Sequence, residues 1–166
     1  MDDHDRYSRL RPPDETPKEE LCRCLPSIPV KLMTALSYNP LHCINCNLEV
    51  VAEGLPLNDA MIQALAHWRS LYDAVYRLWL DSGGYEAWAE EQLADVDSPV
   101  NQLGLSVRKA VDPIRRCYYW YFQNQSVEDF QPKKDCPRCG RAFTNYTKGI
   151  FPQFVCEHCS IITVGE

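Results

Sequence analysis

The sequence lacks any apolar run approaching the roughly 18 residues that a membrane-spanning helix needs. Residues 1–20 are polar and charged, and they lack the apolar core of a secretory signal. We therefore expect a cytoplasmic protein with no membrane partner. Hydrophobic residues make up 45% of the 166-residue chain and charged residues 24%, which is typical of a globular protein.

Catalytic motifs are also lacking. Neither G-x-S-x-G nor H-E-x-x-H occurs, and Gly140 and Gly149 form no phosphate-binding loop. The carboxylates show no pairing pattern that would favour acid–base chemistry. We therefore expect no enzymatic activity. A metal-dependent enzyme is the weaker alternative, and it would require a zinc ion with an exchangeable water ligand.

Cysteine, by contrast, is abundant, with nine residues in the chain. Cys136 and Cys139 form one C-x-x-C pair, Cys156 and Cys159 form another, and sixteen residues separate the pairs. This spacing is typical of a four-thiolate zinc ribbon, and Gly140 suits the tight turn after the first pair. Four thiolates leave no position for water, so this zinc is predicted to be structural. His158 lies inside the second pair and is an alternative ligand.

The N-terminal cysteines allow several interpretations. Cys22, Cys24, Cys43 and Cys46 could complete a second zinc site, although C-x-C is a less common ligand spacing. His42 could substitute for one thiol. A redox pair at Cys43 and Cys46 is a further alternative, but the βαβ context that such a pair usually has is lacking. Cys117 begins an aromatic stretch and is expected to be a buried hydrophobe.

Hydrophobic periodicity predicts an α+β protein with a helical body, a short aromatic strand and a C-terminal zinc ribbon. We expect a flexible arm over residues 1–20, a mainly helical body with an N-terminal cysteine knuckle over 21–132, and the ribbon over 133–166. One helix should begin at Asn58 or Asp59 and end at Gly83. Its apolar stripe comprises Ile62, Leu65, Trp68, Tyr72, Val75 and Trp79.

Two further helices are predicted, over residues 85–93 and 99–112, the second burying Val100, Leu103, Val107 and Val111. Strands are expected within 28–36, 48–52 and 117–122, near Phe143, and over 150–155 and 161–164. In the aromatic strand, we expect Tyr118, Trp120 and Phe122 to face the helices and Tyr119 and Tyr121 to face away. The alternative is a base-stacking surface flanked by Arg115 and Arg116.

Charge is unevenly distributed along the chain, whose net charge is −6. Residues 57–132 contain six basic and eleven acidic residues, whereas residues 133–166 contain five basic and three acidic residues. An acidic body favours a basic protein partner over a phosphate backbone. The ribbon keeps nucleic-acid binding open as an alternative, with phosphate contacts from Lys133, Lys134, Arg138, Arg141 and Lys148.

Several segments resemble an uncharacterised bacterial zinc-ribbon family to which nucleic-acid binding has been ascribed. The similarity covers roughly residues 38–164 and includes Pro40-Leu41-x-Cys43-x-x-Cys46, the stretch 93–105, the aromatic run 118–121 and the two C-terminal pairs. The chain is also loosely similar to double-CXXCG proteins of myxobacteria, some of which resemble immunity proteins. The resemblances imply nucleic-acid binding or the neutralisation of a toxin. Together with the acidic body and the lack of catalytic motifs, they lead us to expect a non-catalytic protein that recognises another protein, such as a basic toxin, with nucleic-acid binding as the alternative.

Overall fold

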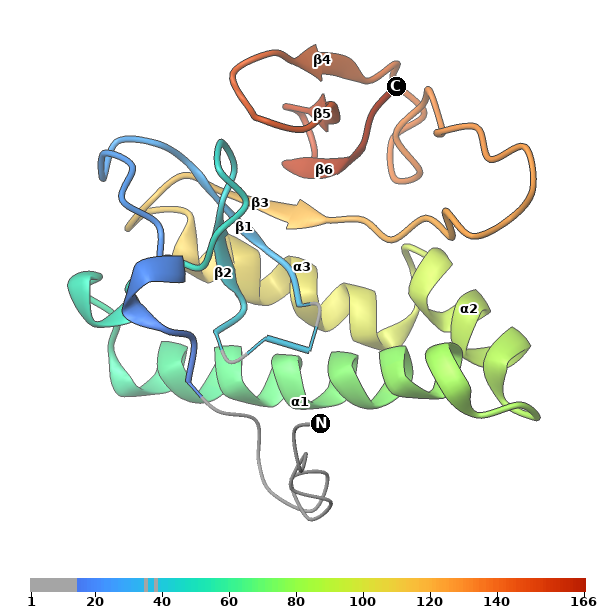
Figure 1. The fold of residues 1–166 in the computed structure, drawn as a ribbon, viewed down its shortest axis with the longest axis horizontal. Coiled ribbons are helices and arrows are strands. Elements are labelled where there is room, and N and C mark those ends of the chain that lie inside the picture. The colour runs from blue at the N-terminus through green and yellow to red at the C-terminus, as the bar shows by residue number, and fades with distance from the viewer. Residues whose placement is uncertain (1–14, 35, 38) are drawn as a thin grey trace, which may run out of the picture.

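The computed structural model describes residues 15–34, 36–37 and 39–166, and it contains three α-helices and a six-stranded mixed sheet (Figure 1). The predicted α+β class is therefore confirmed. Most of the predicted arm, residues 1–14, lies outside the described residues, and Lys18–Glu20 at its end forms a single 3-10 turn, η2. In the described part of the chain, no helix is both long and apolar enough to cross a membrane.

The sheet contains strands from both cysteine-bearing segments of the chain. Its strands are β1 (Val30–Leu32), β2 (Leu41–Cys43), β3 (Cys117–Trp120), β4 (Thr144–Tyr146), β5 (Gln153–Cys156) and β6 (Ile161–Val164). Their spatial order is β2-β1-β3-β6-β5-β4. Strand β3 pairs in parallel with β1 on one side and β6 on the other, while the remaining pairs are antiparallel. The expected description of a helical body with one short aromatic strand is therefore incomplete, because the aromatic segment is an interior strand of a six-stranded sheet.

Two strand predictions need correction. The segment 48–52 forms only one bridge, between His42 and Glu49, and then turns into the short 3-10 helix η3 (Ala52–Gly54). The C-terminal strand expected from residue 150 begins at Gln153, since residues 148–151 form a bend. Both segments are apolar but short, and tertiary pairing rather than composition determines where such strands begin.

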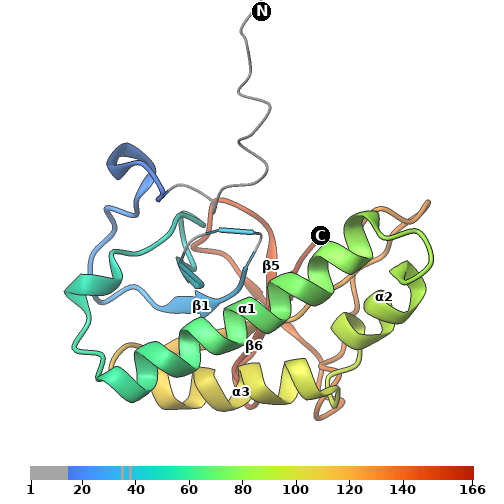
Figure 2. The same cartoon turned by 90° about the horizontal axis from the view of Figure 1, so that it is seen from below.

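Helix boundaries follow local signals closely. Helix α1 (Asp59–Asp81) begins after Asn58, whose side-chain oxygen accepts the Met61 N–H at 2.9 Å. Helix α2 (Glu86–Ala94) is followed by α3 (Pro99–Val111), which has Ser98 as its N-cap. Helices α1 and α3 pack side by side on one face of the sheet, with α2 at one end of the pair (Figure 2).

The side chains of the interior strand β3 point to the faces of the sheet opposite to those predicted. Tyr119 faces the helices, with its ring edge against Trp68 and its hydroxyl donating to Asn101 Oδ1 at 2.6 Å. Tyr118 and Trp120 face the other side of the sheet, where Tyr118 packs with Ile44, Val155 and Ile162. Because the side chains on both faces of β3 are apolar, their alternation along the strand does not show which face packs against the helices. Phe122, beyond the end of the strand, does pack on α1 as predicted, 4.9 Å from Trp79 between ring centroids.

Close approach of α3 to β3 depends on Gly104. A Cβ atom at this position would lie 2.3 Å from Tyr119 Cε2 and 2.5 Å from Trp68 Nε1. The helix therefore sits at a distance from the strand that only a residue without a side chain permits.

Candidate metal centres

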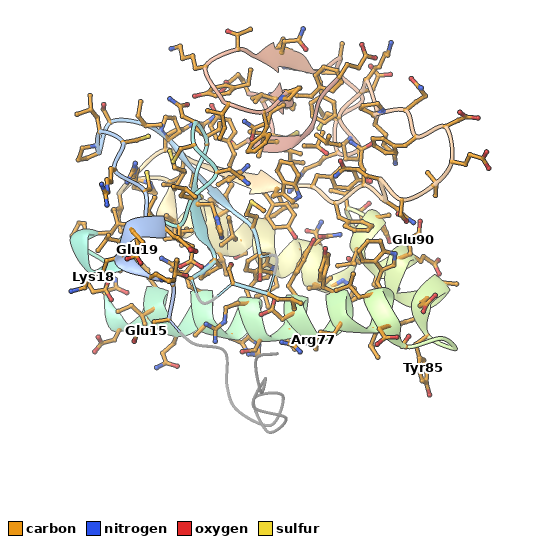
Figure 3. All side chains as sticks on the ribbon, in the orientation of Figure 1. Glu15, Lys18, Glu19, Arg77, Tyr85 and Glu90 are labelled. Carbon is orange, nitrogen blue, oxygen red and sulfur yellow. The ribbon has the colours of Figure 1, made fainter. Side chains whose placement is uncertain are left out.

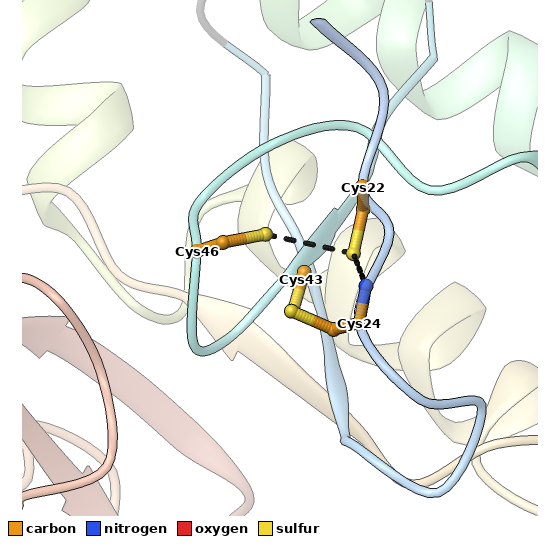
Figure 4. A group of neighbouring side chains, drawn as sticks. All are labelled: Cys22, Cys24, Cys43 and Cys46. Atoms are coloured by element: carbon orange, nitrogen blue, oxygen red, sulfur yellow. Dashed lines mark hydrogen bonds between the residues drawn. The ribbon is translucent and has the colours of Figure 1, made fainter. Parts of the chain in front are cut away.

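The first metal centre lies beside β2 and unites Cys22, Cys24, Cys43 and Cys46 (Figure 4). Their four sulfur atoms all lie within 4.8 Å of one another. Cys43 ends β2 and Cys46 lies on the turn that follows. The C-x-C segment reaches them because the Cys22 N–H donates to the Glu49 carbonyl at 2.7 Å. Of the interpretations that the sequence left open, this convergence favours a second metal site.

The second centre lies at the turn between β5 and β6, on the opposite side of β3 from the first. The sulfur atoms of Cys136, Cys139, Cys156 and Cys159 also lie within 4.8 Å of one another, with 3.7 Å between Cys139 and Cys156. Cys156 is the last residue of β5, and Cys159 lies on the turn between β5 and β6. The structure thus brings together the four C-terminal cysteines that the sequence spacing singled out.

Both groups fit a tetrahedral metal ion. A zinc ion with bonds of about 2.3 Å to four sulfurs requires sulfur–sulfur distances of about 3.8 Å. The distance between Cys22 Sγ and Cys46 Sγ is 3.5 Å, and that between Cys139 Sγ and Cys156 Sγ is 3.7 Å. Small side-chain adjustments would therefore complete either tetrahedron. Four thiolates would fill the coordination sphere, so neither centre offers a site for a reacting water.

All three C-x-x-C turns end on a residue in the left-handed backbone region. The φ angles are +63° at Asn47, +70° at Gly140 and +53° at Ser160. In two of these turns the same residue donates its N–H to the carbonyl of the first cysteine, from Asn47 to Cys43 at 3.0 Å and from Gly140 to Cys136 at 2.9 Å. Glycine is therefore one of three residue types that close this turn here, and Gly140 is the one that its residue type marks as a turn residue in the sequence.

Backbone N–H groups aimed at sulfur favour the thiolate form. Burial raises the pKa of Cys43, but hydrogen bonds from the N–H groups of Cys46 and Asn45 outweigh it, so that its pKa is lowered. The Arg141 N–H is the main cause that lowers the pKa of Cys139 to about 7. Burial raises the pKa of Cys22 and Cys159. In each centre, one thiol thus has a lowered pKa, which favours the thiolate form that binds a metal ion.

Neither histidine proposed as an alternative ligand belongs to a sulfur group. The ring of His42 lies with Nδ1 3.1 Å from the Asn47 carbonyl oxygen and Nε2 3.1 Å from Ser37 Oγ. Burial lowers the pKa of His42. His158 is exposed and lines a cavity next to Cys159. Cys117 is fully buried in the core, where the sequence analysis expected it.

The proposed base-stacking surface is wrong. The rings of Tyr118, Tyr119 and Tyr121 are at most 4% exposed, so they cannot stack on bases. Arg115 donates to the Ile28 carbonyl, and Arg116 pairs with Asp112 and Glu157. These arginines therefore hold segments of the fold together.

The five ribbon cations proposed to contact phosphate lie in different surroundings. Lys133 Nζ is 3.2 Å from the Tyr121 hydroxyl, and Lys134 pairs with Glu166 at 3.1 Å. Arg138 lines a cavity beside α3, whereas Arg141 and Lys148 are exposed elsewhere on the ribbon. Lys133 and Lys134 therefore have partners within the chain, and phosphate contacts by the five cations stay a prediction.

Comparison with known proteins gives no family for this chain. No family model matches it, and no match was found among curated proteins or among solved structures. The two resemblances drawn from its motifs therefore stay hypotheses.

Proposed function

We propose that each four-cysteine group holds a structural zinc ion. Support comes from the two sets of four convergent thiols, because sulfur ligands in a tetrahedron are typical of structural zinc sites. One ion would tie the segment at Cys22 and Cys24 to the turn after β2. The other would tie the turn at Cys136 and Cys139 to the turn between β5 and β6. Small modules of this kind gain much of their folding free energy from the metal.

We further propose that the chain has no catalytic role and acts by recognising a basic protein. The observation that carries this is an exposed surface at the α1–α2 corner, the acidic–aromatic face, which comprises Leu80, Asp81, Tyr85, Glu86, Trp88 and Glu91. Tyr85 is 64% exposed and Trp88 48% exposed. Figure 3 shows Tyr85 projecting away from the body of the molecule. Exposed aromatic residues of this kind are enriched among the residues that dominate binding at protein interfaces.

Charge on this face indicates the kind of partner. Asp81, Glu86 and Glu91 are exposed and lie close to Tyr85 and Trp88 in the sequence, and residues 57–132 as a whole contain eleven acidic against six basic residues. Opposite charge accelerates association and excludes partners of like charge. A basic toxin is the partner class that agrees with the resemblance to immunity-type proteins.

The acidic–aromatic face can be tested by affinity capture with matched variants. The zinc-loaded protein, the double variants Tyr85→Ala/Trp88→Ala and Glu86→Lys/Glu91→Lys, and the control Val127→Ala would be immobilised and exposed to lysate of the source cells. Val127 is 50% exposed and lies outside the face. We expect the wild-type protein and the control to retain the same basic protein and both double variants to lose it. Direct titration with the purified partner should then show an affinity that weakens as salt increases.

Two outcomes would contradict this proposal. One is that no protein is retained while nucleic acid binds tightly at physiological salt. The other is that the retained protein binds all four samples equally. Circular dichroism and a zinc count for each variant would show that the substitutions leave the fold intact.

Nucleic-acid binding through the ribbon is the second candidate function. In the part of the chain that the structure describes, Arg138, Arg141 and Lys148 are exposed and make no ion pair, which leaves them available to phosphate. Such binding would fall steeply with increasing salt. An Arg138→Glu/Arg141→Glu/Lys148→Glu variant that bound nucleic acid as tightly as the wild type would count against it.

A further inference from the structure

An open cavity of about 450 Å³ lies between the last turns of α3 and the second metal centre. Helix α3 contributes Ser106, Arg108 and Lys109 to its wall, and the two cysteine turns contribute Arg138 and His158. These residues come from three separate segments of the chain, so only the folded structure creates the cavity. No carboxylate is among its lining residues.

Two of the three cations in this wall have free hydrogen-bonding capacity. Among the described residues, neither Lys109 nor Arg138 has a carboxylate within ion-pair distance. Arg108 is more constrained, because its Nη1 lies 3.4 Å from Asp112 Oδ1 and donates to the Cys117 carbonyl at 3.3 Å. Its buried Nε has no hydrogen-bond partner. Arg108 therefore contributes charge, while Lys109 and Arg138 can donate to a ligand.

The acidic groups around the cavity have other partners. Asp112 is shared between Arg108 and Arg116. Glu157, next to His158, accepts hydrogen bonds from Arg116 and from the Tyr118 hydroxyl. A zinc ion with four thiolates would add a net negative charge beside Cys159. The sulfur atoms of that centre, however, receive backbone N–H groups, such as those of Arg138 and Arg141.

We propose that this cavity binds a phosphate group. An arginine guanidinium offers two parallel N–H donors that match phosphate oxygens, and a lysine ammonium adds a mobile point charge. Arg138 supplies the first of these groups from a cysteine turn and Lys109 the second from α3, and the Ser106 hydroxyl can donate a further hydrogen bond. The phosphate is carried either by a small molecule such as a nucleoside monophosphate or by the 5′ end of a nucleic-acid strand.

Calorimetric titration of the full-length, zinc-loaded protein would test the site. The probes are inorganic phosphate, a nucleoside monophosphate, and one oligonucleotide with and without a 5′ phosphate. We expect binding of the phosphate-bearing probes to weaken about tenfold or more in Arg138→Gln and in Lys109→Gln, since each removes a hydrogen bond to a charged group. Lys18→Gln, which removes an exposed cation of η2 outside the cavity, is the control and should bind as the wild type does.

The probes also separate the two sources of phosphate. Equal affinity for the nucleoside monophosphate and the phosphorylated strand points to a small ligand. Tighter binding of the strand, lost when its 5′ phosphate is removed, points to nucleic acid. The proposal is overturned if none of the phosphate-bearing probes binds, or if both cavity variants bind them as tightly as the wild type.

A purely structural role for the cations is distinguishable as well. If Arg138 and Lys109 served only to offset the thiolate charge, their replacement would accelerate zinc loss to a chelator and leave phosphate affinity unchanged, and this result would also overturn the proposal. Because these residues lie outside the acidic–aromatic face, the phosphate site and the proposed protein recognition can fail independently.

Discussion

Asn47 and Gly140 hold the same backbone conformation at the same place in two different cysteine turns. Each follows the second cysteine of its pair, has a φ angle in the left-handed region, and donates its N–H to the carbonyl of the first cysteine. The first metal centre is thus built on the same turn as the second, although its sequence lacks the glycine. Asparagine can replace glycine here because it tolerates this region better than most residues.

The turn at Asn47 should tolerate glycine but not a β-branched residue. We expect Asn47→Gly to leave the free energy of unfolding close to that of the wild type and Asn47→Val to lower it by about 1–2 kcal/mol, because valine is strained at positive φ. Urea unfolding of the zinc-loaded proteins measures the difference. Equal stability of the valine and glycine variants would show that the left-handed turn is not maintained in solution.

The zinc content of cysteine variants should show that each centre binds its own ion. We expect two zinc ions per wild-type chain, one in Cys46→Ser and one in Cys139→Ser, since a serine hydroxyl does not replace a thiolate ligand. Cys117→Ala is the matched control and should keep both ions, because Cys117 lies in the core outside either group. Elemental analysis of purified protein gives the count. A single zinc in the wild type would leave the N-terminal thiols without a metal role.

Replacing Gly104 with alanine should damage the core. The added Cβ would overlap the rings of Tyr119 and Trp68, which are themselves fully buried. Overpacking of this kind costs about 1–3 kcal/mol or more. Thermal unfolding of Gly104→Ala should show the loss, while Gly84→Ala, which has no atom within 4 Å of the new Cβ, should unfold at the wild-type temperature. If both variants were equally stable, α3 would have to lie farther from β3 than it does here.

Lys31 should make stability depend on pH in the alkaline range. Its side chain is 2% exposed, donates to Gln153 Oε1 at 2.9 Å and lies 4.5 Å from the Trp120 ring centroid. Burial lowers its pKa to about 8, whereas the unfolded chain keeps the proton up to about pH 10.4. Between these values the unfolded state binds more protons, so stability should rise as pH increases from 8 toward 9.5.

Comparison with Lys31→Met isolates this effect. The methionine variant should lack the rise, whereas Lys148→Met, a change at an exposed loop position, should retain it. The free energy of unfolding would be measured at several pH values with zinc in excess. A wild-type profile that is flat or falls over this range would show that Lys31 keeps its proton in the fold.

Local signals in the sequence predicted the helices well. The 3.6-residue period placed Leu65, Trp68 and Tyr72 on the buried side of α1, and Asn58 and Ser98 marked the starts of α1 and α3. The C-terminal cysteines could be grouped because two pairs at ribbon spacing meet through one hairpin. In each case the interacting residues are close in sequence, so that composition and spacing carry the information.

Features that depend on distant segments were not predictable in this way. The first metal centre requires the Cys22 segment to run beside Glu49, and no spacing rule encodes that contact. Which side chains of β3 face the helices depends on partners for their hydroxyl groups. Asn101 becomes the partner of the Tyr119 hydroxyl only once α3 packs on the sheet. Lys109 and Arg138 likewise share a cavity only in the folded chain.

The parallel pairing of β3 with both β1 and β6 has a consequence for how the chain is made. In β3, Cys117 pairs with Val30 and Tyr119 pairs with Ile161, so each neighbour is contributed by a remote part of the sequence. Contacts of such long range slow folding. On a ribosome, the β6 side of β3 stays unpaired until Ile161–Val164 has been synthesised. An unpaired strand edge promotes aggregation, so the pairing of β6 with β3 protects the interior strand of the sheet.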